Sequence, residues 1–216
     1  MVVYHYSQID KWNEIVRGSY RSSDQPGLGA CRRMGHSDQE AWETSAVFAL
    51  LDPTPKSWTQ NSYFKDIWQW LKWDIGDLLL EIAVDLETDN VFVVDRGHVE
   101  GFLYQDKTDI PERFLHSTRK LAERKMMESR ISLKDFLAKE EELQYALPEV
   151  IFPQHVPLDK IRISNTQPSL EEKARTYPEG WFRDLKIRAK QYVPELSSWI
   201  NNYECREVSS PSKERR

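Results

Sequence analysis

The strongest constraint on the fold is a pair of apolar segments that flank a short polar turn. Residues 78–86 and 91–94 are dominated by Leu, Ile and Val, and Thr88, Asp89 and Asn90 lie between them. Aliphatic runs of this length that are bounded by turn-forming residues are typical of strands. The pattern therefore predicts two strands around a tight turn.

Helical and extended patterns alternate along the rest of the chain. Ser7 is placed to cap the N-terminus of the first helix, and Gly18 is placed where a glycine ends one. Because helices and strands are interspersed, the expected fold class is α+β. The sequence predicts strands near residues 1–6, 47–51, 148–152 and 161–163, and helices near residues 9–16, 63–73, 109–129, 132–146 and, more weakly, 178–203.

Composition limits the class of protein further. The chain has 216 residues, of which 39% are hydrophobic, and its formal net charge is −5. This length suits a single domain over residues 1–205, followed by a disordered tail at 206–216. Cys31 and Cys205 are far apart, there is no secretory pattern, and no apolar run is long enough to span a bilayer. We therefore expect a cytoplasmic protein without a membrane partner, and the acidic balance argues against a general electrostatic hold on nucleic acid.

Two residues stand out as candidates for chemistry. His5 lies in the first predicted strand, and Glu149 begins the strand at 148–152. A histidine on a strand can present its ring to a ligand, but it is often a half-buried residue bonded to a neighbouring loop. An acid at the start of a strand is often only solvated. Each residue alone therefore leaves both interpretations open.

The combination of these residues is more specific. Residues 3–7 read Val-Tyr-His-Tyr-Ser and lead into a short helix and Gly18, and residues 148–153 read Pro-Glu-Val-Ile-Phe-Pro. In this order the motifs resemble the ADP-ribosyltransferase superfamily, in its histidine and glutamate branch and among the DarT-like toxins. The resemblance implies a split antiparallel β-sheet core with flanking helices. It also implies a toxin or effector that uses NAD as a substrate for mono-ADP-ribosyl transfer.

The resemblance assigns roles to individual residues. It implies that Glu149 is the catalytic carboxylate, which binds a ribose hydroxyl and faces the positive charge that develops on the ribose. It further implies that His5, Tyr6 and Ser7 bind NAD, with His5 on the other ribose. Phe48 is the residue of the second core strand that can stack on nicotinamide, although a place in the core is the favoured explanation for it.

Arginines of the long polar segment at residues 20–46 complete the candidate site. The guanidinium groups of Arg21 and Arg32 are suited to the pyrophosphate of NAD, and a solvated loop charge is the alternative interpretation. Leu147 stands where members that modify arginine carry an acid, so arginine modification is not suggested. His98 and His155 have no partners at metal-ligand spacing, so no metal site is expected.

Two other functions remain open from the sequence. An RNA 2′-phosphotransferase, which also consumes NAD, needs several arginines converging on a phosphate. A catalytically inactive protein-interaction module of the same fold is the second alternative. The acceptor of a transferase is left as a nucleic acid base or a protein side chain, and a toxin would have an antitoxin partner.

Overall fold

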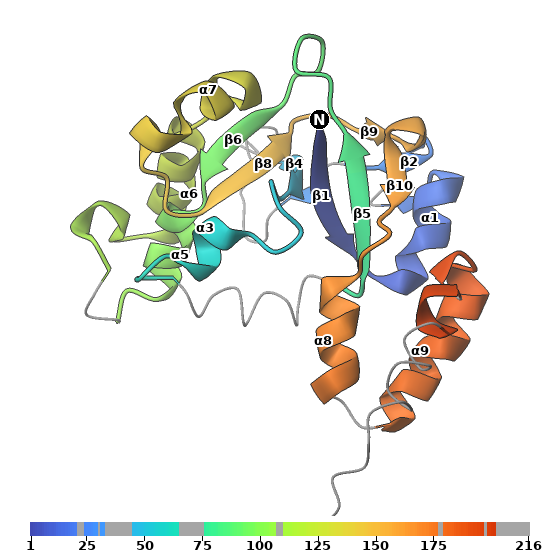
Figure 1. The fold of residues 1–216 in the computed structure, drawn as a ribbon. Coiled ribbons are helices and arrows are strands. Elements are labelled where there is room, and N and C mark those ends of the chain that lie inside the picture. The colour runs from blue at the N-terminus through green and yellow to red at the C-terminus, as the bar shows by residue number, and fades with distance from the viewer. Residues whose placement is uncertain are drawn as a thin grey trace, which may run out of the picture.

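The fold combines helices with antiparallel sheets (Figure 1). Every strand pairing in the described part of the chain is antiparallel, which confirms the expected mixture of helices and antiparallel sheet. The computed structural model describes residues 1–20, 24–29, 31–32, 45–64, 76–106, 110–176, 179–196 and 198–201.

A three-stranded sheet contains the N-terminal strand. Its order is β1 (Val2–Ser7), β5 (Leu78–Ala83) and β10 (Ile161–Ile163), so β5 is central. His5 lies opposite Leu80 across the β1–β5 pair. The burial pattern of β5 is nearly continuous, as expected of a strand with a neighbour on each edge and side chains packed on both faces.

The other strands form a five-stranded sheet and a short ribbon. The five-stranded order is β3 (Cys31–Arg32), β4 (Ser45–Ala49), β8 (Pro148–Phe152), β6 (Phe92–Asp95) and β7 (Ile131–Ser132). The ribbon pairs β2 (Gly27–Leu28) with β9 (Val156–Pro157). All five residues of β8 are buried, because this strand lies between β4 and β6.

The two larger sheets meet at one point in the described chain. Tyr4 of β1 and Leu50, just after β4, exchange two backbone hydrogen bonds of 2.8 and 2.7 Å. This bridge aligns the faces of the two sheets, because residues directly opposite in an antiparallel pair send their side chains to the same side.

Helices cover the two faces of this joined sheet. On one face, Val3, Leu80 and Val150 belong to the largest apolar cluster; on the other, Tyr6 and Leu50 pack with Trp58. The first face is packed by residues of four helices: α1 (Trp12–Arg17), α7 (Leu133–Leu143), α8 (Pro168–Thr176) and α9 (Glu179–Tyr192). The second face is packed by residues of α3 (Lys56–Thr59), α5 (Gly97–Leu103), α6 (Arg119–Glu128) and the 3-10 turn η4 (Glu112–Phe114). Two further 3-10 turns are η1 (Ile9–Lys11) and η5 (Leu158–Lys160).

Several local expectations are confirmed and others are wrong. Gly18 ends α1 with a φ of 81°, a left-handed conformation that glycine adopts readily. Ser7 caps no helix, because it remains in β1 opposite Leu78 and its hydroxyl is buried. The helix expected over 109–129 is interrupted, because Thr118 is extended and its hydroxyl accepts the Leu121 amide to start α6.

The two strands expected around one tight turn also differ from a hairpin. β5 and β6 both form, but they belong to different sheets, because β5 pairs with β1 and β10 whereas β6 pairs with β8 and β7. The helix expected at 63–73 lies largely outside the described residues, and so does the tail at 206–216. In the described part of the chain, no helix has both the length and the apolar character needed to cross a membrane.

A buried carboxylate ties the end of β6 to the start of β8. Asp95 is only 5% exposed. Its Oδ1 accepts the backbone amides of Gly97 and Leu147, at 2.9 and 3.0 Å, and its Oδ2 accepts the amide of Ala146 at 3.1 Å. One side chain therefore satisfies three amides in segments about 50 residues apart in the chain, as the separations of these bonds record.

We expect Asp95→Ala to lower the free energy of unfolding by about 3–5 kcal/mol, because three amides would lose their acceptor in a buried place. Chemical denaturation at pH 7 measures this. Asp95→Asn keeps one oxygen acceptor and is expected to cost less, and exposed Asp159→Ala is the control, with a change below about 0.5 kcal/mol. A loss below about 1 kcal/mol for Asp95→Ala would contradict the structural role.

Candidate active site

The candidate site begins where β1 and β4 separate. Continuation of the ladder beyond the Tyr4–Leu50 bridge would pair Tyr6 with Phe48. Instead, the carbonyl oxygen of Phe48 lies 2.6 Å from Nδ1 of His5. The imidazole therefore holds a backbone carbonyl at the point where the two sheets part.

This hydrogen bond determines how the His5 ring is oriented. A carbonyl oxygen can only accept, so Nδ1 carries the hydrogen and donates it. In the neutral ring the other nitrogen, Nε2, is then the acceptor. His5 is 6% exposed, so this acceptor is held inside the protein by a rigid strand.

Tyr6 and Ser7 extend the site along β1. Because the backbone groups of Tyr4 point toward β4, those of Tyr6 point the same way, into the gap between the strands. The Tyr6 hydroxyl donates to the carbonyl of Pro53 at 2.7 Å, and burial raises its pKa well above the ordinary value. The Ser7 hydroxyl is buried and has no hydrogen-bond partner among the described residues.

Glu149 lies in a buried ionic cluster on β8. Its Oε1 accepts from Nη1 of Arg96 at 2.9 Å, and Nε of the same guanidinium donates to Glu100 at 2.5 Å. Glu149 and Glu100 are each 3% exposed. The guanidinium also lies over the ring of Trp58, 5.6 Å from its centroid, which adds a cation–π contact.

Arg96 is the common partner of two buried carboxylates. Burial by itself would lower the pKa of Arg96, but the charges of Glu149 and Glu100 outweigh it and raise the pKa above its ordinary value. Among the described residues, this one guanidinium forms ion pairs with both carboxylates. A charged partner inside the protein therefore fixes the position of the Glu149 carboxylate.

The register brings some predicted site residues together and separates others. His5 contacts the carbonyl of Phe48 where β1 and β4 separate, and Tyr6 and Ser7 follow His5 along β1. Glu149 lies opposite Val94, two strands away from β1 through β4, which is roughly 10 Å between backbones. Strand alternation directs the side chain of Glu149 to the face of Leu50 and Tyr6, whereas His5 leaves on the face of Val3 and Leu80.

Three other predicted site residues have different outcomes. The ring of Phe48 is half-buried and packs with Ile151 in an apolar cluster, as expected of a core residue. Arg32 lies in β3, but its side chain is outside the described part of the structure, and Arg21 is outside the described residues altogether.

Sequence reasoning missed the partners of Glu149. Arg96 and Glu100 are four residues apart at the start of α5, a spacing that favours an ion pair, and this was the available signal. Trp58 gave none, because its Nε1 reaches the carbonyl of Pro148 only through the tertiary fold.

A pair of histidines near this cluster was missed as well. Nδ1 of His98 in α5 lies 3.0 Å from Nε2 of His116, and the His98 ring packs edge-on against Phe114. This pair is not accompanied by a third ligand: no group of three or more histidine, cysteine or carboxylate side chains suited to a metal occurs among the described residues.

Comparison with known proteins adds no family to these observations. The chain matches no protein-family model, no curated protein and no solved structure. The function is therefore argued from the geometry of the site.

We expect Arg96→Met to lower the free energy of unfolding by about 3–5 kcal/mol at pH 7, because it removes a buried guanidinium that pairs with two buried carboxylates. Urea denaturation at pH 7 measures the effect. The same substitution combined with Glu100→Gln and Glu149→Gln also removes both carboxylate charges and should cost less stability. An equal loss in the single and the triple variant would contradict the cluster.

Stability should also depend on the histidine pair. Burial lowers the pKa of His98; the charge of Asp95 opposes this shift and that of His116 adds to it. Burial also lowers the pKa of His116, and the charge of Lys125 lowers it further. Both rings are therefore more acidic than in the unfolded chain, where histidine takes up a proton near pH 6.5.

We expect the free energy of unfolding to fall as the pH drops from 7.5 to 5.5, because the unfolded state then binds more protons than the folded state. Replacing both His98 and His116 with Gln should flatten this dependence. Val99→Ala destabilises the same helix without removing a titratable group and should keep the wild-type slope. Equal slopes in all three proteins would refute the assignment.

Proposed function

We propose that this protein is an NAD-dependent mono-ADP-ribosyltransferase whose reaction centre lies at the gap between β1 and β4. The observation that carries the proposal is the split antiparallel sheet, with His5 at the point of separation and a buried carboxylate, Glu149, two strands away. Antiparallel sheets with helices on their faces support the core that the motif resemblance implies, and both motif residues are buried although they are polar.

The gap offers suitable partners for the nicotinamide end of NAD. A carboxamide needs one donor and one acceptor, and the backbone N–H and C=O of Tyr6 point into the gap. His5, oriented by the Phe48 carbonyl, presents Nε2 to a ribose hydroxyl. The buried Ser7 hydroxyl is a further polar group within the same strand.

Glu149 and its cluster supply the electrostatic part of the reaction. When the bond between nicotinamide and ribose breaks, the electron pair leaves with nicotinamide and positive charge develops on the ribose. The negative charge of Glu149, whose side chain is buried, would stabilise that charge. Arg96 fixes one oxygen of Glu149, so the carboxylate needs little reorganisation during the reaction.

The end of the β1–β4 ladder also explains how His5 and Glu149 would act on one ligand although their side chains lie on opposite faces of the sheet. Beyond the bridge β1 and β4 form no further ladder pair in the described chain, and we place the nicotinamide end of NAD at this point. His5 would then act from one face and Glu149 from the other.

The acceptor is a nucleic acid base or a protein side chain. The basic helix α6 gives nucleic acid only limited support. Two of its cations pair with its own carboxylates, Arg119 with Glu123 and Lys125 with Glu128. Acceptors of both classes therefore belong in the assay.

We expect the purified protein to release nicotinamide from NAD labelled on the nicotinamide, and to transfer label from adenylate-labelled NAD to a macromolecule in cell extract or to added single-stranded DNA. Glu149→Gln should lower the rate at least about 100-fold, because it removes the charge that faces the ribose. Glu100→Gln is the matched control, since it removes the other ion pair of the same Arg96 and should keep most of the activity per folded molecule, with the folded fraction of each variant measured by thermal denaturation.

Three outcomes would overturn the proposal. Equal loss in the two glutamate variants would mean that the cluster is only structural. Release of nicotinamide only with 2′-phosphorylated RNA would assign the phosphotransferase reaction. No release with any acceptor, together with no binding of millimolar NAD by calorimetry, would leave a protein-interaction module.

A further inference from the structure

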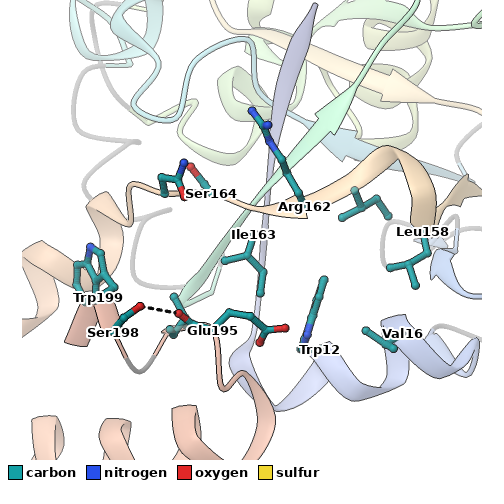
Figure 2. Close-up of a pocket in the computed structure, with 12 residues that line it drawn as sticks. Trp12, Val16, Leu158, Arg162, Ile163, Ser164, Glu195, Ser198 and Trp199 are labelled. Atoms are coloured by element: carbon teal, nitrogen blue, oxygen red, sulfur yellow. Dashed lines mark hydrogen bonds between the residues drawn. The ribbon is translucent and has the colours of Figure 1, made fainter. Parts of the chain in front are cut away.

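A second candidate site lies beside β10, the outer strand of the three-stranded sheet. A hollow of about 600 Å³ separates α1 from β10 and from the chain around Glu195, and its size is that of a ligand-binding site (Figure 2). Trp12 and Val16 of α1 line it from one side, and Ile163 of β10 points into it. The hollow includes neither motif residue of the proposed reaction centre.

The rim of this hollow is an open strand edge. β10 is the last strand of its sheet, and nothing in the described chain pairs with its other side. The amide of Ser164 donates to the carbonyl of Leu79, which sets the alternation of the ladder. By that alternation the backbone groups of Arg162 point to β5, whereas the N–H and C=O of Ile163 point outward.

The backbone of Ile161 is only partly available. Its amide donates to the carbonyl of Leu158 at the end of η5, so its carbonyl alone points outward. The edge therefore presents one donor and two acceptors in the order C=O, N–H and C=O. Only another extended backbone can satisfy this row with regular hydrogen bonds.

A carboxylate inside the hollow gives the site a charge. The side chain of Glu195 projects toward Trp12, and within the described structure it forms no ion pair (Figure 2). Arg162 does not neutralise it, because its side chain points away from the hollow and binds Glu81. A carboxylate beside an indole ring is suited to a cationic side chain, which gains both an ion pair and a cation–π contact.

We propose that β10 binds an extended segment of another protein that carries a lysine or arginine. The segment adds as a strand next to Ile163, with one side chain out of two directed into the hollow. An apolar side chain packs on Val16 and Leu158, and the basic side chain reaches Glu195 and Trp12. This site is independent of the proposed transferase activity.

The test starts from random ten-residue peptides displayed on phage and selected on the full-length protein. We expect enriched peptides to alternate apolar residues and to contain a lysine or arginine. A synthetic copy of the most enriched peptide, labelled with a fluorophore, then gives a dissociation constant by anisotropy. Its binding should slow hydrogen exchange of the Ile163 amide.

Four variants distinguish the contribution of the β10 backbone to peptide binding from that of the Glu195 charge. Ile163→Pro removes the outward N–H but no bond to β5, and proline is tolerated at such an edge position, so binding should fall at least tenfold while the fold is kept. Glu195→Gln should also weaken binding at least tenfold. Glu195→Lys should instead favour a peptide in which the basic residue is replaced by glutamate. Arg162→Gln, on the opposite face of β10, is the matched control and should bind as the wild type does.

Several results would overturn this inference. Selection that enriches no peptide would do so, as would peptides that bind Glu195→Gln and wild type equally. Binding without protection of the Ile163 amide, or binding of free arginine or of a quaternary ammonium ion as tight as that of the peptide, would mean a small-ligand pocket and not a strand-addition site.

Discussion

Two backbone hydrogen bonds between Tyr4 and Leu50 hold together the two larger sheets of this protein. They align the sheets so that one apolar cluster runs beneath both, from Val3 to Val150. The pairing of β1 with β4 ends after this bridge, because the carbonyl of Phe48, which would accept the next hydrogen bond of the ladder, accepts one from the His5 ring instead. A polar ring is therefore buried at the point where the ladder between β1 and β4 ends.

The buried ion cluster shows why a structural and a chemical role can belong to the same side chain. Glu149 anchors Arg96, which holds the start of α5, and Asp95 next to it ties the backbone of that turn to β8. Charged groups are stable in the interior only when such a frame keeps their partners in place. The frame that stabilises the fold also fixes the carboxylate that the proposed reaction needs.

The sequence predicted the elements with clear local signals and missed those that depend on distant partners. β1, β4, β8 and β10 were expected from apolar runs, and the left-handed Gly18 from its place after a helix. Ser7 was misassigned, because a serine before a helix and a serine at the end of a strand have the same local pattern. The cap depends on where the strand ends, and pairing with Leu78 decides that.

The sequence by itself determined the spacing of apolar residues in each segment. That spacing indicates which positions of a segment face the core and which motif residues lie on strands. Tertiary structure alone decided that β5 and β6 separate into different sheets, that His5 and Glu149 leave opposite faces, and that Arg96 meets Glu149. The physical reason is that side-chain period is local, whereas the choice of strand partner depends on contacts between segments more than 40 residues apart, such as His5 with Phe48.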